Sequence, residues 1–389
     1  MGGTIGFYGR EDELHEQASK ATGLSDFGAP DYLPALRVLL ASIDADARLT
    51  DGGAKLVWDA LVITLVARAM TEKGWRDFPE YRQANIARPI VITGVPRTGT
   101  TALHKLLAVD PQFQGFEHWL TTCPMPRPPR EEWHAQPQYA QAVRFVEGVF
   151  ESAPDFRIAH NVVVDELDEC LEILRQSFVS NRWACTWTSP GYDAWWQTQS
   201  EAGSYRRFAD VMRLIGCHDP ERRWLLKNPG HIAALDLLFE ELPDALVIQT
   251  HRDPVQAITS MSSTLYHLHS AFEGAGAKVS APLLGPRELE KWASAVDHAR
   301  PVRERHRAQI LDVDHLDFHR NPLDVIGRIY DHCGLRLTAE VEALMAQRVR
   351  EKPELSHGAH NYDMADFGLR REGIEARFDT YIDEFGLAK

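Results

Sequence analysis

Cysteine is scarce in this sequence, and its pattern is not that of a disulfide framework. The 389 residues include only five cysteines, an odd number, and no C-x-x-C motif occurs among them. They lie far apart, at Cys123, Cys170, Cys185, Cys217 and Cys333. Widely spaced cysteines fit reduced thiols in a cytoplasm better than bridges in a secreted protein. We therefore expect a cytoplasmic protein.

Long apolar runs and positive charge are also lacking. The most apolar run, residues 56–70, is interrupted by Asp59 and Arg68, which predicts a buried helix instead of a membrane span. The N-terminus has no apolar segment of signal-peptide type. With 56 acidic and 42 basic residues, the net charge of −14 argues against nucleic acid or an anionic membrane as the main partner. A bound anion would therefore need a local cluster of basic residues.

One stretch, residues 89–107, supplies such an anion site. Residues 90–92 (IVI) form a short β-branched run that is typical of a buried strand. A loop with glycines at Gly94 and Gly99 follows, and residues 102–107 have helical spacing. A strand, a glycine loop and a helix N-terminus in this order direct backbone N–H groups at one point, where they favour a phosphate.

The spacing of this loop matches the Walker motif G-x-x-x-x-G-K-[ST] except at one position. Thr100 stands where that motif has lysine, and the only cation of the loop is Arg97. The Walker lysine reaches the β- and γ-phosphates of a triphosphate. A loop without it can hold a phosphate but is poorly suited to a γ-phosphoryl group. A small-molecule kinase that uses ATP and Mg²⁺ is therefore an alternative and not the preferred interpretation.

Three further strand–helix units follow the loop. Short apolar runs at 224–226, 246–248 and 310–313 each precede polar residues and a helical pattern. Strands that alternate with helices predict an α/β fold, a three-layer arrangement with a central parallel sheet and ligands at the carboxyl ends of the strands. Lys227 and Arg252 each follow one of these strands and so belong to the ligand-binding edge.

The remaining regions have a mostly helical pattern. We expect residues 1–85 to form a helical N-terminal cap and residues 86–389 to form the α/β domain, with a helical insertion around 110–222. Within the insertion, residues 165–169 (DELDE) are interpreted as the acidic first turn of a helix and not as a metal site. The aromatic cluster around Trp183 and Trp187 fits core packing and an apolar acceptor pocket equally well.

The loop also resembles that of a known family. Residues 96–101 (PRTGTT) resemble the 5′-phosphosulfate loop of sulfotransferases that use 3′-phosphoadenosine 5′-phosphosulfate (PAPS), whose bacterial branch often carries the arginine. The family has a P-loop-like α/β fold. The resemblance implies that the 5′ side of PAPS is bound by Arg97, Thr98, Gly99, Thr100 and Thr101.

A second pair of residues supports the same resemblance. Arg252 and Ser260, eight residues apart, resemble the pair that binds the 3′-phosphate in the family. A guanidinium together with a hydroxyl donor suits a ribose 3′-phosphate. Asp253 could be mistaken for a metal ligand, but its place before Pro254 fits a helix N-cap better. No metal is required by the motifs that we find.

The resemblance further implies a catalytic lysine. Lys227 resembles the family's active-site lysine, which stabilises the transferring sulfuryl group. In the animal branch a catalytic histidine lies two residues after that lysine, where this chain has Pro229. Two candidates for the general base are therefore His231, the nearest imidazole, and Glu117, which loosely matches a glutamate of another bacterial branch. His118 is a third.

Together these observations predict sulfuryl transfer from PAPS to a hydroxyl, or an amine, of a small molecule of apolar or aromatic character. Besides the kinase, the other alternative is a nucleotide-binding regulator that has lost its chemistry. The histidine pairs His267/His269 and His315/His319 are interpreted as surface or packing residues. Residues 356–362 and 377–386 resemble segments of the bacterial group, and no role is assigned to them. The motifs do not predict the oligomeric state.

Overall fold

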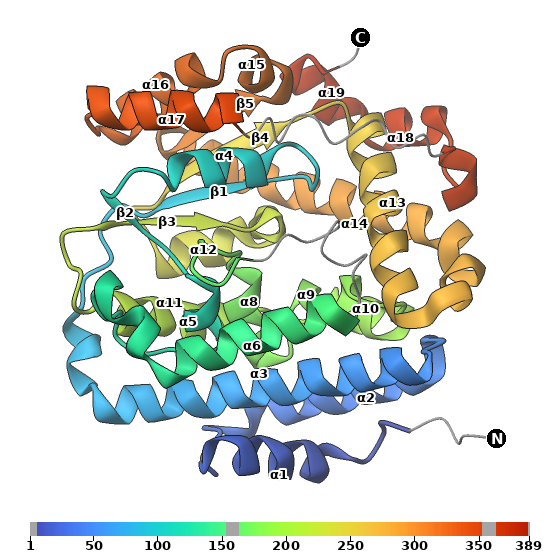
Figure 1. Ribbon diagram of the computed structural model, residues 1–389. Coiled ribbons are helices and arrows are strands. Elements are labelled where there is room, and N and C mark those ends of the chain that lie inside the picture. The colour runs from blue at the N-terminus through green and yellow to red at the C-terminus, as the bar shows by residue number, and fades with distance from the viewer. Residues whose placement is uncertain (1–5, 153–162, 352–362, 388–389) are drawn as a thin grey trace. The chain divides into compact units, whose positions relative to one another are not determined.

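The computed structural model describes residues 6–152, 163–351 and 363–387, and it contains two compact units (Figure 1). The first consists of residues 1–85, 116–220 and 264–280, and the second of residues 86–115, 221–263 and 281–389. Residues 1–85, predicted as a helical cap, thus share a unit with most of the predicted insertion at 110–222.

The first unit is helical in its described residues. Its long helix α3(Asp51–Asp77) packs against α1(Glu11–Thr22). The predicted buried helix at 56–70 lies within α3, whose N-cap Thr50 accepts a hydrogen bond from the Gly53 amide at 3.0 Å. The remaining helices are α2(Leu33–Asp46), α5(His118–Thr122), α6(Pro137–Ser152), α8(Leu171–Leu174), α9(Asn181–Cys185), α10(Pro190–Trp196) and α11(Ala202–Gly216).

The aromatic cluster belongs to the core of this unit. Trp183 and Trp187 are 1% and 0% exposed. Trp183 stacks on Phe178 with ring centroids 5.4 Å apart, and Trp187 meets Phe272 edge-on at 5.8 Å. Rings that are covered by other rings contribute packing energy and offer no face to a ligand. Of the two interpretations left open by the sequence, core packing is the one that the geometry favours.

The acidic run at 165–169 does not open a helix, contrary to the sequence prediction. Helix α8 begins only at Leu171, and the run lies in a turn beside the start of α5. The His118 amide donates to the Glu166 carbonyl at 3.1 Å, and the Asp168 amide donates to the Phe116 carbonyl at 2.7 Å. These tertiary hydrogen bonds replace the helical ones, which is why first-turn composition was misleading here.

The second unit is built on a five-stranded sheet of order β2-β3-β1-β4-β5, in which all paired strands are parallel. This confirms the predicted α/β fold with a central parallel sheet. The strands are β1(Ile90–Gly94), β2(Phe113–Gln114), β3(Arg223–Lys227), β4(Leu246–His251) and β5(Ile310–Asp314). Every residue of β1 and β4 is buried, as expected of strands covered on both faces.

Helices flank this sheet in Figure 1, with α4 in front of it and α14 behind it. Helix α4 also contacts α17 as well as strands β1 and β3. The helices that lie wholly in the second unit are α4(Thr100–Leu107), α12(Leu235–Glu241), α15(His315–Arg320), α16(Pro322–Cys333), α17(Ala339–Glu351), α18(Arg371–Arg377) and α19(Asp379–Phe385). Two more helices begin in one unit and end in the other, α13(Pro254–Glu273) and α14(Ala277–Arg305).

Candidate functional site

The phosphate loop follows β1, the central strand of the sheet, and leads into α4. Gly94 has φ +147°, and a side-chain Cβ there would lie 2.5 Å from the Thr250 carbonyl oxygen of β4. Gly99, the N-cap of α4, has φ +94°. Both positions need glycine, the first for close approach to β4 and the second for its left-handed backbone. The strand–loop–helix arrangement predicted for residues 89–107 is therefore confirmed.

Threonine side chains fix the shape of this loop. The buried Thr98 hydroxyl donates to the Val95 carbonyl at 2.7 Å and lies 2.5 Å from the hydroxyl of Thr250. Thr93, in β1, donates to the Pro229 carbonyl at 3.0 Å. Thr98 thus holds the loop to β4, and Thr93 holds the strand before it to the segment after β3.

Three of the predicted nucleotide-binding residues converge beside the loop. The guanidinium of Arg97 donates to the Ser260 hydroxyl at 3.1 Å, and that of Arg252 donates to the Arg97 carbonyl at 2.9 Å. Arg97 itself is exposed and has φ +71°, a conformation that non-glycine residues seldom adopt. Burial, and next the charge of Arg97, lower the pKa of Arg252, while Asp253 opposes this. Two guanidinium groups are thus held together at the carboxyl ends of β1 and β4.

Lys227 occupies the corresponding place on the other side of β1. It is the last residue of β3, which pairs with β1, and its side chain is buried. Its ammonium group donates to the Thr101 hydroxyl at 3.2 Å. The loop that carries Arg97 therefore meets Lys227 at the start of α4. The structure brings the predicted lysine and the predicted loop together.

His231 lies close to Lys227 along the chain but is enclosed by the protein. It sits in the 3-10 segment η5(Pro229–Ala234), which the Asn228 side chain caps by accepting from the Gly230 amide at 3.0 Å. The imidazole is 0% exposed, and this burial lowers its pKa to about 3. It is therefore neutral at pH 7, and its basicity is well below that of an ordinary histidine.

Glu117 belongs to the first unit, where its carboxylate forms an ion pair with a buried arginine. The Nε atom of Arg127 lies 3.0 Å from each carboxylate oxygen of Glu117, and the two side chains are 3% and 5% exposed. The same guanidinium donates to Asp219 at 3.1 Å. The buried cation beside Glu117 was not predicted from the sequence.

His118, the residue after Glu117, has an oriented imidazole. Its Nδ1 atom lies 2.6 Å from a carboxylate oxygen of Asp168. A carboxylate at Nδ1 keeps that nitrogen protonated, which leaves Nε2 to accept a proton. His118 was the third candidate predicted from the sequence, with less support than the other two, and its pairing with Asp168 was not predicted.

Two histidines that the sequence did not single out for binding lie near the phosphate loop, His315 against Gly99 and His319 against His315. His315 follows β5 directly, and its ring would be 3.1 Å from a Cβ placed on Gly99. The Nε2 atoms of His315 and His319 are 2.7 Å apart. The position of His315 at the carboxyl end of a parallel strand was the signal that could have revealed it. We call Arg97, Arg252, His315 and His319 the basic cluster.

The end of β4 is supported by the C-terminal helix α19. His251, which precedes Arg252, lies 2.9 Å from the Tyr381 hydroxyl through Nδ1 and 2.7 Å from an Asp312 carboxylate oxygen through Nε2. The aromatic ring of Phe385 stacks on the same imidazole at 3.9 Å. The backbone that carries Arg252 is thus fixed from two sides.

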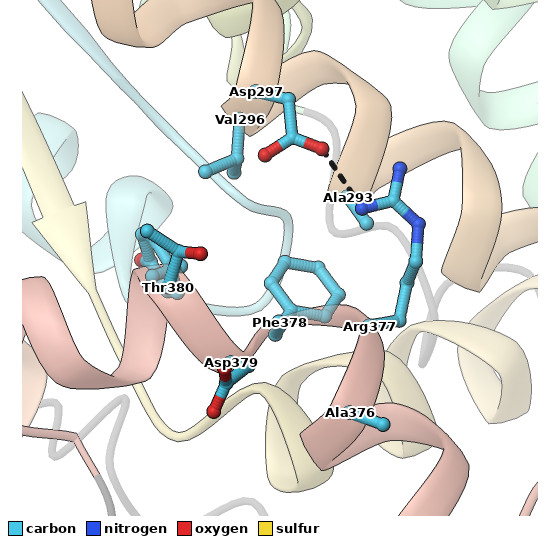
Figure 2. Close-up of a pocket in the computed structure, with 9 residues that line it drawn as sticks. Ala293, Val296, Asp297, Ala376, Arg377, Phe378, Asp379 and Thr380 are labelled. Atoms are coloured by element: carbon cyan, nitrogen blue, oxygen red, sulfur yellow. Dashed lines mark hydrogen bonds and ion pairs between the residues drawn. The ribbon is translucent and has the colours of Figure 1, made fainter.

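A separate pocket of about 260 Å³ lies between α14 and the junction of α18 with α19. Figure 2 shows the guanidinium of Arg377 facing the carboxylate of Asp297 across it, and the two groups are 2.8 Å apart. Arg377 also pairs with Glu290 at 2.9 Å. Its guanidinium is therefore engaged in holding the C-terminal helices to α14. The first residue of the segment 377–386 thus has a structural contact. The segment 356–362 lies outside the described residues.

Within the described parts of the chain, no group of three or more histidine, cysteine, aspartate or glutamate residues is arranged to hold a metal ion. Nor does any helix found there have the length and apolar character that a membrane crossing requires.

A phosphate loop after the central strand of a parallel sheet, with a lysine and two arginines around it, defines the class of P-loop-like α/β proteins. More narrowly, the chain belongs to the sulfotransferase family, whose sequence profile matches residues 89–339.

Solved structures agree with this assignment. The sulfotransferase STF1 from Mycobacterium tuberculosis H37Rv is 36% identical, with 97% of this chain and 100% of that one covered and a TM-score of 0.83. The sulfotransferase STF9 from Mycobacterium avium shares the fold, with 24% identity, 99% and 98% of the two chains covered and a TM-score of 0.88.

A further relative is the omega-hydroxy-beta-dihydromenaquinone-9 sulfotransferase Stf3 of Mycobacterium tuberculosis, which is 27% identical over 274 residues. The aligned segment covers 64% of this chain and 63% of that protein, which is less than two thirds of its length.

Proposed function

We propose that the protein transfers a sulfuryl group from PAPS to a hydroxyl group of a small-molecule acceptor. The observation that carries this proposal is the meeting of Arg97, Arg252 and Ser260 beside the phosphate loop. A sulfate donor such as PAPS is the substrate that membership of the family implies.

The chemistry of the site fits a ligand with two anionic groups. Two guanidinium groups lie together, and the only carboxylate among the causes that shift the pKa of Arg252 is Asp253, next to it in the chain. Like charges held in proximity are stabilised when an anion binds between them. We assign the 5′ side of PAPS to residues 97–101 and its 3′-phosphate to Arg252 and Ser260.

The transfer would exchange one sulfur–oxygen bond for another. The bond from sulfur to the phosphate oxygen of the donor breaks, the bond from sulfur to the acceptor oxygen forms, and the hydroxyl proton passes to a base. Lys227 would stabilise the negative charge that develops on the bridging oxygen. A kinase that uses ATP and Mg²⁺ is not favoured, because Thr100 replaces the lysine that reaches the γ-phosphate.

The general base is a further part of the proposal, with His231 and Glu117 as its candidates. Both are hindered as proton acceptors. Burial lowers the pKa of His231 to about 3, and the carboxylate of Glu117 accepts a hydrogen bond from Arg127. The imidazole of His118 has a carboxylate partner in Asp168, 2.6 Å from Nδ1. The deciding experiment compares turnover of His231→Ala, Glu117→Gln and His118→Asn, with intact binding of adenosine 3′,5′-bisphosphate required of each variant.

Loss of the true base should lower kcat by roughly 10²-fold or more. Near-normal kcat in His231→Ala would remove the first candidate, and the same reasoning applies to the other two variants.

The acceptor is proposed as an apolar or aromatic alcohol. The relative Stf3 is named for an omega-hydroxy-beta-dihydromenaquinone-9. From that name we carry over only the chemical type, a hydroxyl on an apolar molecule. Incubation with labelled PAPS and a panel of phenols, sterols, lipids and sugars tests it. Transfer confined to sugars would contradict the acceptor class and leave the reaction type standing.

Calorimetric titration tests the donor. We expect adenosine 3′,5′-bisphosphate to bind without metal and more tightly than ATP with Mg²⁺. Arg252→Ala should weaken the bisphosphate by about 1.5–3 kcal/mol, roughly tenfold or more, and affect adenosine 5′-monophosphate much less. Arg371→Ala is the matched control, because Arg371 is exposed and pairs only with Glu375 in its own helix among the contacts described.

Two results would contradict the proposal. Binding of ATP with Mg²⁺ and none of the bisphosphate would favour a kinase. Tight bisphosphate binding without turnover on any acceptor would favour a regulator. If Arg252→Ala weakened the binding of adenosine 3′,5′-bisphosphate and of adenosine 5′-monophosphate equally, Arg252 would support the loop and would not contact the 3′-phosphate.

A further inference from the structure

The histidine pair of α15 has an arrangement that packing alone does not require. His315 is buried, and His319, one helical turn later, places its ring edge-on against it with centroids 3.9 Å apart. Their Nε2 atoms are 2.7 Å apart, so one proton is shared between them. The Nδ1 atoms on the opposite edges are both buried, and neither has a hydrogen-bond partner among the described residues.

Leaving a buried polar atom without a hydrogen-bond partner costs free energy. Two such atoms in one pair, beside a phosphate loop, point to a partner that arrives from outside the protein. The position of the pair predicts that this partner is an anion. His315 contacts Gly99 of the phosphate loop, and the guanidinium charge of Arg252 acts on both imidazoles.

The shared proton determines what the pair can offer. When both rings are neutral, one Nε2–H donates to the other Nε2, so the pair presents one Nδ1–H donor and one bare Nδ1 acceptor. When one proton is added, both Nδ1 atoms carry hydrogen and the pair becomes a double donor with a positive charge. Only the protonated form offers an N–H donor at every outer edge together with a positive charge, which favours an anion.

Burial, together with nearby cations, keeps the pair neutral while no anion is bound. Burial, and then Arg252, His319 and Arg97, lower the pKa of His315 to about 3. Burial and Arg252 also lower the pKa of His319.

The nearest acids do not compensate this. On the same helix, the Asp317 carboxylate is paired with Arg328 of α16, and Asp314 accepts the Asp317 amide as the N-cap. Asp253 acts on Arg252. A bound phosphate would raise the pKa of the imidazoles, because it neutralises the guanidinium groups and accepts hydrogen bonds from the imidazoles at the same time.

We propose that His315 and His319 form a proton-coupled contact for the 3′-phosphate of the donor nucleotide, so that the protein takes up a proton when the nucleotide binds. This inference rests on the proposed function, since it assumes that Arg252 marks the 3′-phosphate position. In the register of β4 and β5, His251 pairs with Asp314, so Arg252 and His315, the residues that follow them, lie at the same edge of the sheet and on the same side of the loop.

The test measures proton linkage. Adenosine 3′,5′-bisphosphate is titrated calorimetrically in buffers of different ionisation enthalpy, at several values between about pH 5.5 and pH 7.5, which bracket the ordinary pKa of histidine. The variants are His315→Gln and His319→Gln; glutamine keeps a polar group near Nε2 but does not titrate. His298→Gln is the matched control, because His298 is an exposed histidine of the same unit that pairs with Asp236.

The wild type and the control should take up a proton, to a maximum of one per nucleotide. Their affinity should rise toward low pH relative to both glutamine variants, with a ceiling of about tenfold per pH unit for one linked proton. The comparison with the variants cancels the titration of the ligand, whose phosphates have a second pKa near 6. Adenosine 5′-monophosphate, which lacks the 3′-phosphate, should show no difference between wild type and variants.

Bisphosphate binding with the same proton uptake in wild type and both variants would overturn this inference and leave the proposed function intact. The same follows if the variants lose proton linkage with the 5′-monophosphate as well, because the pair would then face the other phosphate. Failure of the wild type to bind bisphosphate at any pH would instead overturn the proposed function. Circular dichroism confirms that each variant is folded across the pH range.

Discussion

Arginine serves two different purposes in the two units of this protein. In the first unit, Arg127 is buried with Glu117 and also reaches Asp219. In the second unit, Arg252 donates to the backbone carbonyl of Arg97 and to the side-chain oxygen of Gln256, with the guanidinium of Arg97 and the carboxylate of Asp253 as its charged neighbours. One arginine is paired with a buried carboxylate, whereas the other is held by neutral oxygens beside a second arginine.

The difference separates structural from functional charge. The two carboxylate oxygens of Glu117, each 3.0 Å from Nε of Arg127, offset the free-energy cost of burying the guanidinium. Removing either partner leaves the other charge buried without compensation. A cluster of like charges destabilises the fold that holds it and is retained where ligand binding requires it. The following predictions test whether this distinction holds.

The largest effect is expected from breaking the pair in the first unit. Glu117→Gln leaves Arg127 buried without its full counter-charge and should lower the free energy of unfolding by about 3–5 kcal/mol. Urea denaturation measures it. Glu375→Gln, which removes an exposed pair with Arg371, is the control and should cost at most about 1 kcal/mol. Similar small losses in both variants would mean that Glu117 is not a structural partner, which would strengthen its candidacy as a base.

A smaller effect concerns pH and the buried His231. Its pKa is about 3 in the folded protein, below the usual value near 6.5 of an unfolded chain, so the unfolded chain binds more protons between these values. The free energy of unfolding contributed by His231 is therefore fully present above about pH 6.5 and is lost as the pH falls, by up to about 1.4 kcal/mol per pH unit. His231→Gln should flatten this dependence in denaturation series. Parallel pH profiles for variant and wild type would show that His231 is accessible to protons, as a general base has to be.

The smallest effect has the opposite sign. Without nucleotide, Arg252→Gln should raise the free energy of unfolding by about 0.5–2 kcal/mol, because one cation leaves the cluster while its hydrogen-bonding capacity is partly kept. Arg127→Gln, the same substitution in the first unit, should lower it. Thermal unfolding followed with and without adenosine 3′,5′-bisphosphate provides the measurement. A loss of stability in both variants would remove the distinction between the two arginines.

The sequence predicted the second unit better than the first. Strands β1, β3, β4 and β5 were predicted from short apolar runs, since parallel strands are buried on both faces. Strand β2 has only two residues and leaves no such run. The loop and the placement of Lys227 and Arg252 at strand ends followed from local spacing, and the structure brings these residues together.

Local sequence patterns could not predict which residues form hydrogen bonds or ion pairs across long distances in the sequence. Residues 165–169 have the composition of a helix start, yet they pair with the segment 116–118 through tertiary hydrogen bonds. The carboxylate of Glu117 and the guanidinium of Arg127 lie in a loop region whose path no periodicity defines. His315 and His319 were dismissed because no carboxylate or cysteine nearby suggested a metal, and the possibility of an anion was not weighed. Histidines at strand ends should be compared with the whole ligand-binding edge of the sheet.

The support of β4 by α19 has a consequence for synthesis of the chain on the ribosome. Tyr381, which holds His251, is made 130 residues after it, and the phosphate loop is older still. The nascent protein thus carries its loop well before α19 is made, and the backbone beside Arg252 gains the support of α19 only when Tyr381 and Phe385 have emerged. Chains that are released before α19 should retain the sheet, with His251 lacking both of these contacts.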